Sequence, residues 1–162
     1  MIYAIIFFAS LIIDQVTKAL VEAYDYDRII ILGRLFTIER PIRNTGAALS
    51  MLADKPWAQA VFIVLTVVMM TVLVLYFIFK KENSKWLNVS LTLVASGAIG
   101  NFIDRVAFKG VRDFIGMDLY FVSYTCNVAD IAISVGAVML VFYFLFLDKE
   151  AIFKKKEKPN DK

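Results

Sequence analysis

Aspartates recur within long apolar stretches of this sequence, and they are the residues from which chemistry could be built. Placing a charged side chain at the centre of a membrane span costs about 2.5–3.5 kcal/mol, so each one needs an explanation. Asp14 lies four residues before Lys18 and Asp104 lies beside Arg105, so both aspartates could belong to structural ion pairs. Asp130 has no lysine or arginine three or four residues away on either side. A structural role is therefore hardest to assign to Asp130.

A pair of carboxyl groups is the strongest chemistry that the residue inventory allows. The chain has no histidine and one cysteine, Cys126, which excludes histidine-dependent catalysis, histidine-ligated zinc, a cysteine-built metal cluster and an internal disulfide. A metal site made of carboxylates alone stays open on composition. Two aspartates in one site share a proton, because ionising both is unfavourable. The ionised member can take a proton from water while the protonated member polarises a carbonyl group, and nearby asparagine or arginine side chains can stabilise the developing charge.

Four segments are long and apolar enough to carry these residues across a membrane. Of the 162 residues, 60% are hydrophobic, whereas soluble domains are about 45–50% apolar. A span needs about 20 mostly apolar residues. The predicted spans cover residues 2–21, 57–79, 86–106 and 126–147. The first lacks a basic start and a small-residue cleavage site, which favours a span over a signal peptide. We expect an all-α membrane protein with four transmembrane helices, forming one membrane-embedded domain over residues 1–162.

The first connection, between the first two spans, contains structure of its own. Two runs, residues 29–33 and 35–42, are typical of short β-strands, and residues 44–46 (Asn-Thr-Gly) are typical of a turn. Residues 47–53 resemble a short amphipathic helix. We therefore expect a small extracytoplasmic β-sheet on the outer face of the membrane, accompanied by this helix. The third connection holds Asp113, which lies beside Arg112 and could be either a functional group or half of a solvated ion pair.

Charge along the chain predicts its orientation in the membrane. The short loop between the second and third spans and the tail, residues 148–162, are rich in lysine, and basic short loops favour the cytoplasm. With both termini cytoplasmic, the polar residues of three spans gather at the outer end: Asp14 and Lys18 late in the first, Asn101, Asp104 and Arg105 late in the third, and Asn127 and Asp130 early in the fourth. The net charge of +3 is spread along the chain and is not typical of nucleic-acid binding.

Five sequence blocks resemble one known family, lipoprotein signal peptidase, the type II signal peptidase of bacteria. They follow the family's order and cover nearly the whole chain. The blocks are residues 14–18 (DQVTK), 44–48 (NTGAA), 97–106 (GAIGNFIDRV), 111–114 (VRDF) and 127–130 (NVAD).

The resemblance implies an intramembrane aspartic endopeptidase with Asp113 and Asp130 as the catalytic pair. It implies substrate-binding or supporting roles for Asp14, Lys18, Asn44, Gly46, Asn101, Asp104, Arg105 and Asn127. The implied substrate is a prolipoprotein whose lipobox cysteine carries diacylglycerol, cleaved just before that cysteine. The family works without metal or other cofactor, in contact with membrane lipids, and is inhibited by globomycin-type peptides. It is found in the bacterial cytoplasmic membrane, with its active site near the outer leaflet.

Two points remain open beside this resemblance. Arg112 stands where an apolar residue is commoner in the family, and its charge could depress the pKa of Asp113. A second function class is a proton- or cation-coupled transporter that uses Asp14, Asp104 and Asp130 as a relay. Such a transporter would not need Asp113, whereas the peptidase needs it.

Overall fold

The computed structural model describes residues 1–24, 28–33, 35–46, 55, 57–79 and 84–148. Within these ranges, four helices are long and apolar enough to cross a membrane, as predicted. They are α1 (Ile2–Ala23), α2 (Ala58–Phe79), α3 (Lys85–Phe108) and α4 (Val128–Phe142), the last continued by a π-helical turn, η2 (Tyr143–Leu147). The fourth helix begins at Val128 and not at residue 126, because Asn127 caps it. The basic tail beyond residue 148 and the predicted amphipathic helix at 47–53 lie outside the described residues.

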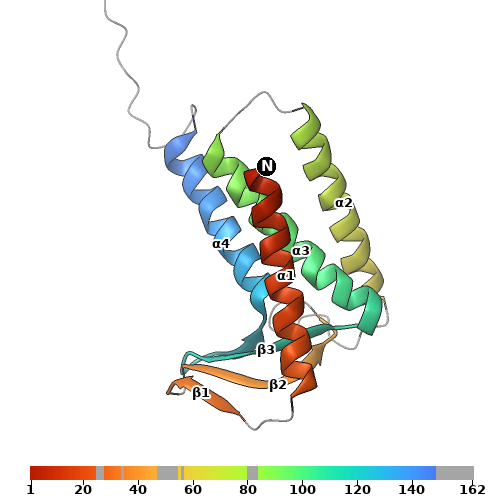
Figure 1. Cartoon of the computed structure of the whole chain (residues 1–162), viewed down its shortest axis with the longest axis vertical. Coiled ribbons are helices and arrows are strands. Elements are labelled where there is room, and N and C mark those ends of the chain that lie inside the picture. Colours follow the sequence, from red (N-terminus) through yellow and green to blue (C-terminus); the bar gives the residue numbers. More distant parts are fainter. Residues whose placement is uncertain (25–27, 34, 47–54, 56, 80–83, 149–162) are drawn as a thin grey trace, which may run out of the picture.

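Helix α3 is the centre of the bundle, with α1 and α4 packed on one side and α2 standing off on the other (Figure 1). Small residues permit this close packing. A side chain on Gly97 would come within 2.4 Å of the Ala129 carbonyl oxygen of α4, and one on Gly100 within 2.5 Å of the Asp14 carboxylate of α1. The glycines therefore bring three helices together at the level of the polar residues, as small residues do in membrane helix packing.

A four-stranded antiparallel sheet closes one end of the bundle, with strand order β1-β2-β3-β4. Its strands are β1 (Ile29–Leu32), β2 (Phe36–Asn44), β3 (Val111–Asp118) and β4 (Ser123–Cys126). The first two strands match the prediction. The last two were not predicted, since the third connection has no clear alternation of apolar and polar residues. They form because β3 pairs with β2, from Phe36 opposite Met117 to Asn44 opposite Val111.

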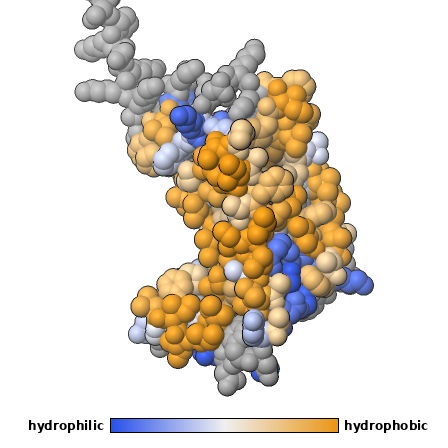
Figure 2. Space-filling view, viewed as in Figure 1, coloured by the Kyte–Doolittle hydropathy of each residue, from blue (hydrophilic) through white to orange (hydrophobic). Residues whose placement is uncertain are grey.

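The sheet and the chain ends lie at opposite ends of the bundle (Figure 1). The N-terminus and the end of α4 are together at one end, while the sheet crosses the other end and projects sideways past α4. In space-filling view this projection is a largely apolar lobe, separated from the helices by a hollow (Figure 2). Its exposed apolar residues come from β1 and from the turn between β3 and β4; they are Ile29, Ile30, Ile31, Leu32, Leu119, Tyr120, Phe121 and Val122.

Candidate active site

Asp130 lies in the first turn of α4, where the Asn127 cap controls its position. The Asn127 side chain accepts a hydrogen bond from the Asp130 backbone N–H at 3.0 Å, and Asp130 Oδ2 accepts one from the Asn127 N–H at 3.2 Å. This reciprocal capping box satisfies two helix-terminal donors and fixes the aspartate rotamer. The other oxygen, Oδ1, accepts from Asn101 Nδ2 of α3 at 2.7 Å. A carboxylate that looked isolated in sequence is thus held by two asparagines.

Asp113 reaches the same place from the sheet. It lies on β3 and is 2% exposed. Its Oδ2 accepts a hydrogen bond from Asn44 Nδ2 of β2 at 2.8 Å, and its Oδ1 accepts from Asn127 Nδ2 at 2.6 Å. Asn127 therefore donates to both carboxylates, through its side chain to Asp113 and through its backbone to Asp130. Two acidic groups that are distant in sequence converge on one asparagine.

The surroundings of Asp113 favour its protonated form. Burial is the largest effect and, together with the negative charge of Asp130, raises the pKa of Asp113 from 3.8 to about 6. Hydrogen bonds from Asn44 and Asn127, and the charge of Lys18, act in the opposite direction. The two carboxyls are thus coupled, as is required of a pair that shares one proton.

A fully buried ion network lies behind Asp130. Lys18 Nζ is 2.9 Å from Asp14 Oδ2 and 3.6 Å from Asp104 Oδ2, and it donates to Asn101 Oδ1 at 3.0 Å. The other Asp14 oxygen accepts from the backbone N–H of Ala129 at 2.8 Å, next to Asp130. Lys18 thereby orients the Asn101 amide that binds Asp130, and Asp14 fixes the start of α4. This network links α1, α3 and α4.

The turn after β2 is held by side chains from two helices. Asn44 Oδ1 accepts from the Gly46 N–H at 2.9 Å, and the amide nitrogen of the same side chain donates to Asp113. Arg105 of α3 donates to the Gly46 carbonyl at 3.2 Å, and Gln59 of α2 donates to the Thr45 carbonyl. The turn, and the asparagine within it, are therefore anchored to the helices.

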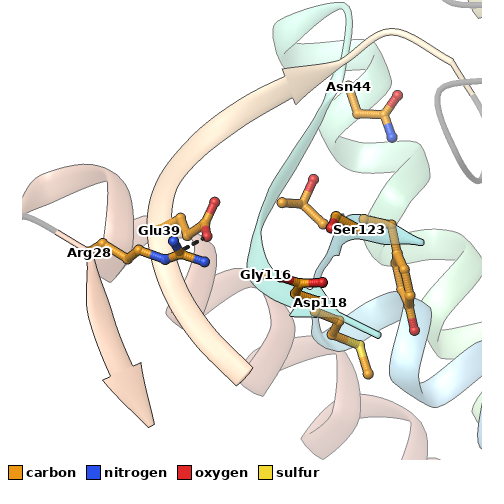
Figure 3. A pocket seen from close by; sticks show the side chains of 9 residues that line it. Arg28, Glu39, Asn44, Gly116, Asp118 and Ser123 are labelled. Atoms are coloured by element: carbon orange, nitrogen blue, oxygen red, sulfur yellow. Dashed lines mark ion pairs between the residues drawn. The ribbon is translucent and has the colours of Figure 1, made fainter. Parts of the chain in front are cut away.

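A cavity of about 530 Å³ opens on the sheet beside this turn (Figure 3). Its wall includes Asn44, which contacts Asp113, and an ion pair between Arg28 and Glu39 at 3.1 Å. Its other lining residues are Gly116, Met117, Asp118, Ser123, Tyr124 and Thr125. The cavity reaches the carboxyl pair through Asn44, which donates to Asp113; Asp113 and Asp130 are not among its lining residues.

The structure brings the predicted site residues together. They form one connected set: Asp14, Lys18, Asn44, Gly46, Asn101, Asp104, Arg105, Asp113, Asn127 and Asp130. No role was predicted for Gln15, whose side chain donates to Asp14 and to the Gly100 carbonyl, or for Glu22, which pairs with two arginines. Gln15 lies three residues before Lys18 and Glu22 four residues after it, so all three share one face of α1. This spacing was the sequence signal that could have identified Gln15 and Glu22.

Arg112 does not have the effect on Asp113 that the sequence suggested. The pKa of Asp113 is raised and not depressed, with burial as the main cause. Neighbouring residues of a strand point to opposite faces, and the Arg112 guanidinium accordingly faces Asp104 on α3 while Asp113 faces Asn44 and Asn127.

The chain is similar to known proteins along most of its length. The family described as signal peptidase (SPase) II matches residues 6–146. A lipoprotein signal peptidase of Geobacter metallireducens is 39% identical over 144 residues, which cover 86% of this chain and 87% of that protein. One of Pseudomonas aeruginosa strain PAO1 is 39% identical over 136 residues, covering 80% and 79%. The chain belongs to the signal peptidase II family. Signal peptidase II enzymes are aspartic peptidases, and the match gives no support to a cation-coupled transporter.

A solved structure agrees with the fold of this signal peptidase II. It is a bacterial membrane enzyme determined by the in meso method at 2.3 Å resolution, with a TM-score of 0.81 and 28% sequence identity. The alignment covers 96% of this chain and 93% of the other. Four apolar helices with a small antiparallel sheet are therefore shared with an experimentally determined membrane enzyme.

Proposed function

We propose that this signal peptidase II removes signal peptides from diacylglyceryl-modified prolipoproteins, cleaving before the lipidated cysteine with Asp113 and Asp130. The observation that carries the proposal is the meeting of both carboxyls at Asn127, which donates to one through its side chain and to the other through its backbone. One carboxylate takes a proton from the attacking water, and the protonated partner donates to the carbonyl oxygen of the scissile peptide bond. The tetrahedral intermediate then collapses, and the amine leaves with a proton from the pair.

The remaining polar residues support this pair in three ways. Asn44, Asn101 and Asn127 orient the two carboxyls by hydrogen bonds of 2.6–2.8 Å. Arg105 supplies positive charge close to them and holds Gly46. Lys18 neutralises the aspartates behind Asp130. The supporting group is Asp14, Lys18, Asn44, Gly46, Asn101, Asp104, Arg105 and Asn127, and it requires no metal or cofactor.

The distribution of polar and apolar surface supports one placement in the membrane. The carboxyl pair lies at the end of the bundle that carries the sheet, and the end of α4, which precedes the basic tail in the sequence, lies at the other. We assign the sheet end to the outer leaflet of the cytoplasmic membrane and both termini to the cytoplasm. The apolar lobe supports this assignment, since Ile30 is 65% and Phe121 is 98% exposed and both would meet lipid at the membrane surface. A lipid-anchored substrate can then enter sideways from the bilayer, and globomycin-type peptides should compete for the same site.

The pH dependence of cleavage tests the proton sharing. Catalysis needs one proton on the pair, so activity should fall on the acid side, where both carboxyls are protonated, and on the alkaline side, where both are ionised. Because the pKa of Asp113 is about 6, one limb of the profile should have its midpoint near pH 6 and not near pH 4. The measurement is the turnover rate in detergent between pH 4 and 9. A flat profile would contradict the shared proton.

The requirement for lipid on the substrate tests the substrate class. The purified protein is incubated with a prolipoprotein that carries diacylglycerol on its lipobox cysteine, and processing is followed by gel shift. A matched sample uses the same prolipoprotein without the lipid. We expect the lipid-modified form to be cleaved and the unmodified form to be cleaved at least about 100-fold more slowly, since the lipid places the peptide at the depth of the site. Equal cleavage of both forms would reject this substrate class.

A further inference from the structure

Arg112 is the most extensively bonded side chain near the carboxyl pair that has no role in the mechanism above. It is 5% exposed, although it lies on the strand that leaves the helical bundle. Its guanidinium donates to both oxygens of Asp104, at 3.1 Å from Nε and 2.8 Å from Nη2. It also donates to Glu22 at 3.1 Å and to Gln15 at 3.3 Å. A planar guanidinium suits such paired, two-oxygen recognition better than an ammonium group does.

These contacts join three elements at one residue. Asp104 lies on α3, Gln15 and Glu22 lie on α1, and Arg112 itself lies at the start of β3, next to Asp113. The backbone N–H of Arg112 adds a further bond to Asp104 Oδ2 at 2.9 Å. The strand that carries Asp113 is therefore anchored to α1 and α3. The same two helices carry Lys18 and Asn101, which orient Asp130.

We infer that Arg112 is a positioning residue for Asp113. It anchors the first residues of β3 to α1 and α3, so that the Asp113 carboxyl is held at Asn127. The inference rests on the proposed function, because it assigns Asp113 to catalysis. It requires no contact between Arg112 and substrate. The Arg112 and Asp113 side chains leave the strand on opposite faces, so the effect is transmitted through the strand backbone.

Arg43 provides a matched control in the neighbouring strand. It lies directly opposite Arg112 in the pairing of β2 with β3. Both guanidiniums lie 4.4 Å from the centroid of the Phe108 ring, and both pair with Glu22. Of these two arginines, Arg112 is the one that binds Asp104, and the Arg43 side chain is 41% exposed. Replacing each arginine therefore separates the Asp104 connection from the contacts that both arginines share.

The test compares Arg112→Met, Arg112→Lys and Arg43→Met as full-length proteins in detergent. The Met variant at 112 should fold, because Asp104 keeps the residue-112 backbone N–H at 2.9 Å and Lys18 at 3.6 Å. For Arg112→Met we expect kcat on lipid-modified prolipoprotein to fall about 100-fold with KM changed by less than about threefold, as for a misplaced catalytic group. The pH limb near 6 should move to lower pH, because a loosened Asp113 becomes more hydrated.

The two other variants bracket that result. Arg112→Lys keeps the positive charge but loses the planar guanidinium that binds both Asp104 oxygens, so its kcat should lie between those of Arg112→Met and wild type. The kcat of Arg43→Met should stay within about twofold of wild type. If Arg112→Met and Arg43→Met lower kcat by the same factor, or if Arg112→Met leaves the pH profile unmoved, the inference is overturned.

Hydrogen exchange separates this inference from the proposed function, because it needs no turnover. Amide exchange of the peptide spanning residues 111–118 should be faster in Arg112→Met than in Arg43→Met. Equal exchange in the two variants would overturn the positioning role even if both proteins cleave. A wild-type protein that fails to cleave prolipoprotein would reject the proposed function, and the exchange data would still decide whether Arg112 orders the strand.

Discussion

Replacing either Asp113 or Asp130 by asparagine should abolish cleavage of lipid-modified prolipoprotein, with turnover reduced by about 10⁴-fold or more. Asparagine keeps the size of the side chain but can neither accept a proton from water nor donate one to the scissile carbonyl. The two effects should not add, because each variant already breaks the same proton-sharing unit. The measurement is single-turnover cleavage by each single variant and by the double variant.

The fold should survive both substitutions, which separates chemistry from stability. Each aspartate accepts hydrogen bonds from amide groups, and an asparagine oxygen can replace one of them. Thermal unfolding midpoints should therefore stay close to wild type. Asp148, which follows η2 at the opposite end of the bundle from the carboxyl pair, supplies the control, and Asp148→Asn should retain near-normal turnover. Normal cleavage by Asp113→Asn would contradict the account and would revive a mechanism that needs only intramembrane aspartates.

Replacing Lys18 by methionine should be the most destabilising single change in the helices, at about 3–5 kcal/mol. Lys18 is 0% exposed and lies 2.9 Å from Asp14 and 3.6 Å from Asp104. Removing its ammonium group leaves two buried carboxylates with less compensating charge and removes the hydrogen bond that Asn101 Oδ1 accepts from Lys18. Both stability and activity should fall, since Asn101 then no longer holds Asp130 in one orientation. Thermal unfolding in detergent measures the first effect, and prolipoprotein cleavage measures the second.

A double variant identifies the cause of that loss. Asp14→Asn together with Lys18→Met removes one of the uncompensated charges, while the asparagine oxygen can still accept from the Ala129 N–H. The double variant should be more stable than Lys18→Met alone. Lys55→Met, which changes an exposed lysine, should leave the unfolding temperature unchanged. If Lys18→Met behaves like Lys55→Met, the buried network does not stabilise the fold as described.

The spans and the position of the polar residues could be predicted because both depend on local patterns. Twenty apolar residues define a span whatever surrounds them, and the order of spans then places Asp14, Asn101 and Asp130 at one end of the bundle. Runs such as residues 29–32 also carry their own strand preference. These features follow from residue type and spacing, and the structure has them where the sequence analysis expected them.

The sheet could not be predicted in full because half of it depends on a distant partner. Residues 111–118 lack a clear strand pattern, and they become β3 only through pairing with β2, some seventy residues earlier in the chain. The start of α4 was misplaced for a related reason, since β4 ends at Cys126 and Asn127 caps the helix directly after it. The double role of Asn127, which donates to both Asp113 and Asp130, likewise appears only when strand and helix meet.

The role of Arg112 was misjudged from its neighbour in sequence. The charge of a residue next in sequence is expected to affect the pKa of its neighbour. On a strand, however, adjacent side chains lie on opposite faces, so the Arg112 guanidinium contacts Asp104 and not Asp113. The long-range contacts of Gln15 and Glu22 were unpredictable in the same way, although their spacing along α1 is regular. Sequence spacing reports local geometry, whereas this ion network is defined by three elements that meet only in the folded chain.

The most direct test of the whole account is the identity of the cleavage products made by the purified chain as the only protein present. Lipid-modified prolipoprotein is incubated with wild-type protein or with Asp130→Asn, and the products are identified by mass spectrometry. We predict that the wild-type sample yields a protein whose first residue is the diacylglyceryl cysteine, together with the released signal peptide, and that the Asp130→Asn sample yields neither. The account is contradicted if folded wild-type protein leaves the precursor intact or cuts elsewhere, or if the Asp130→Asn protein produces the same cleavage.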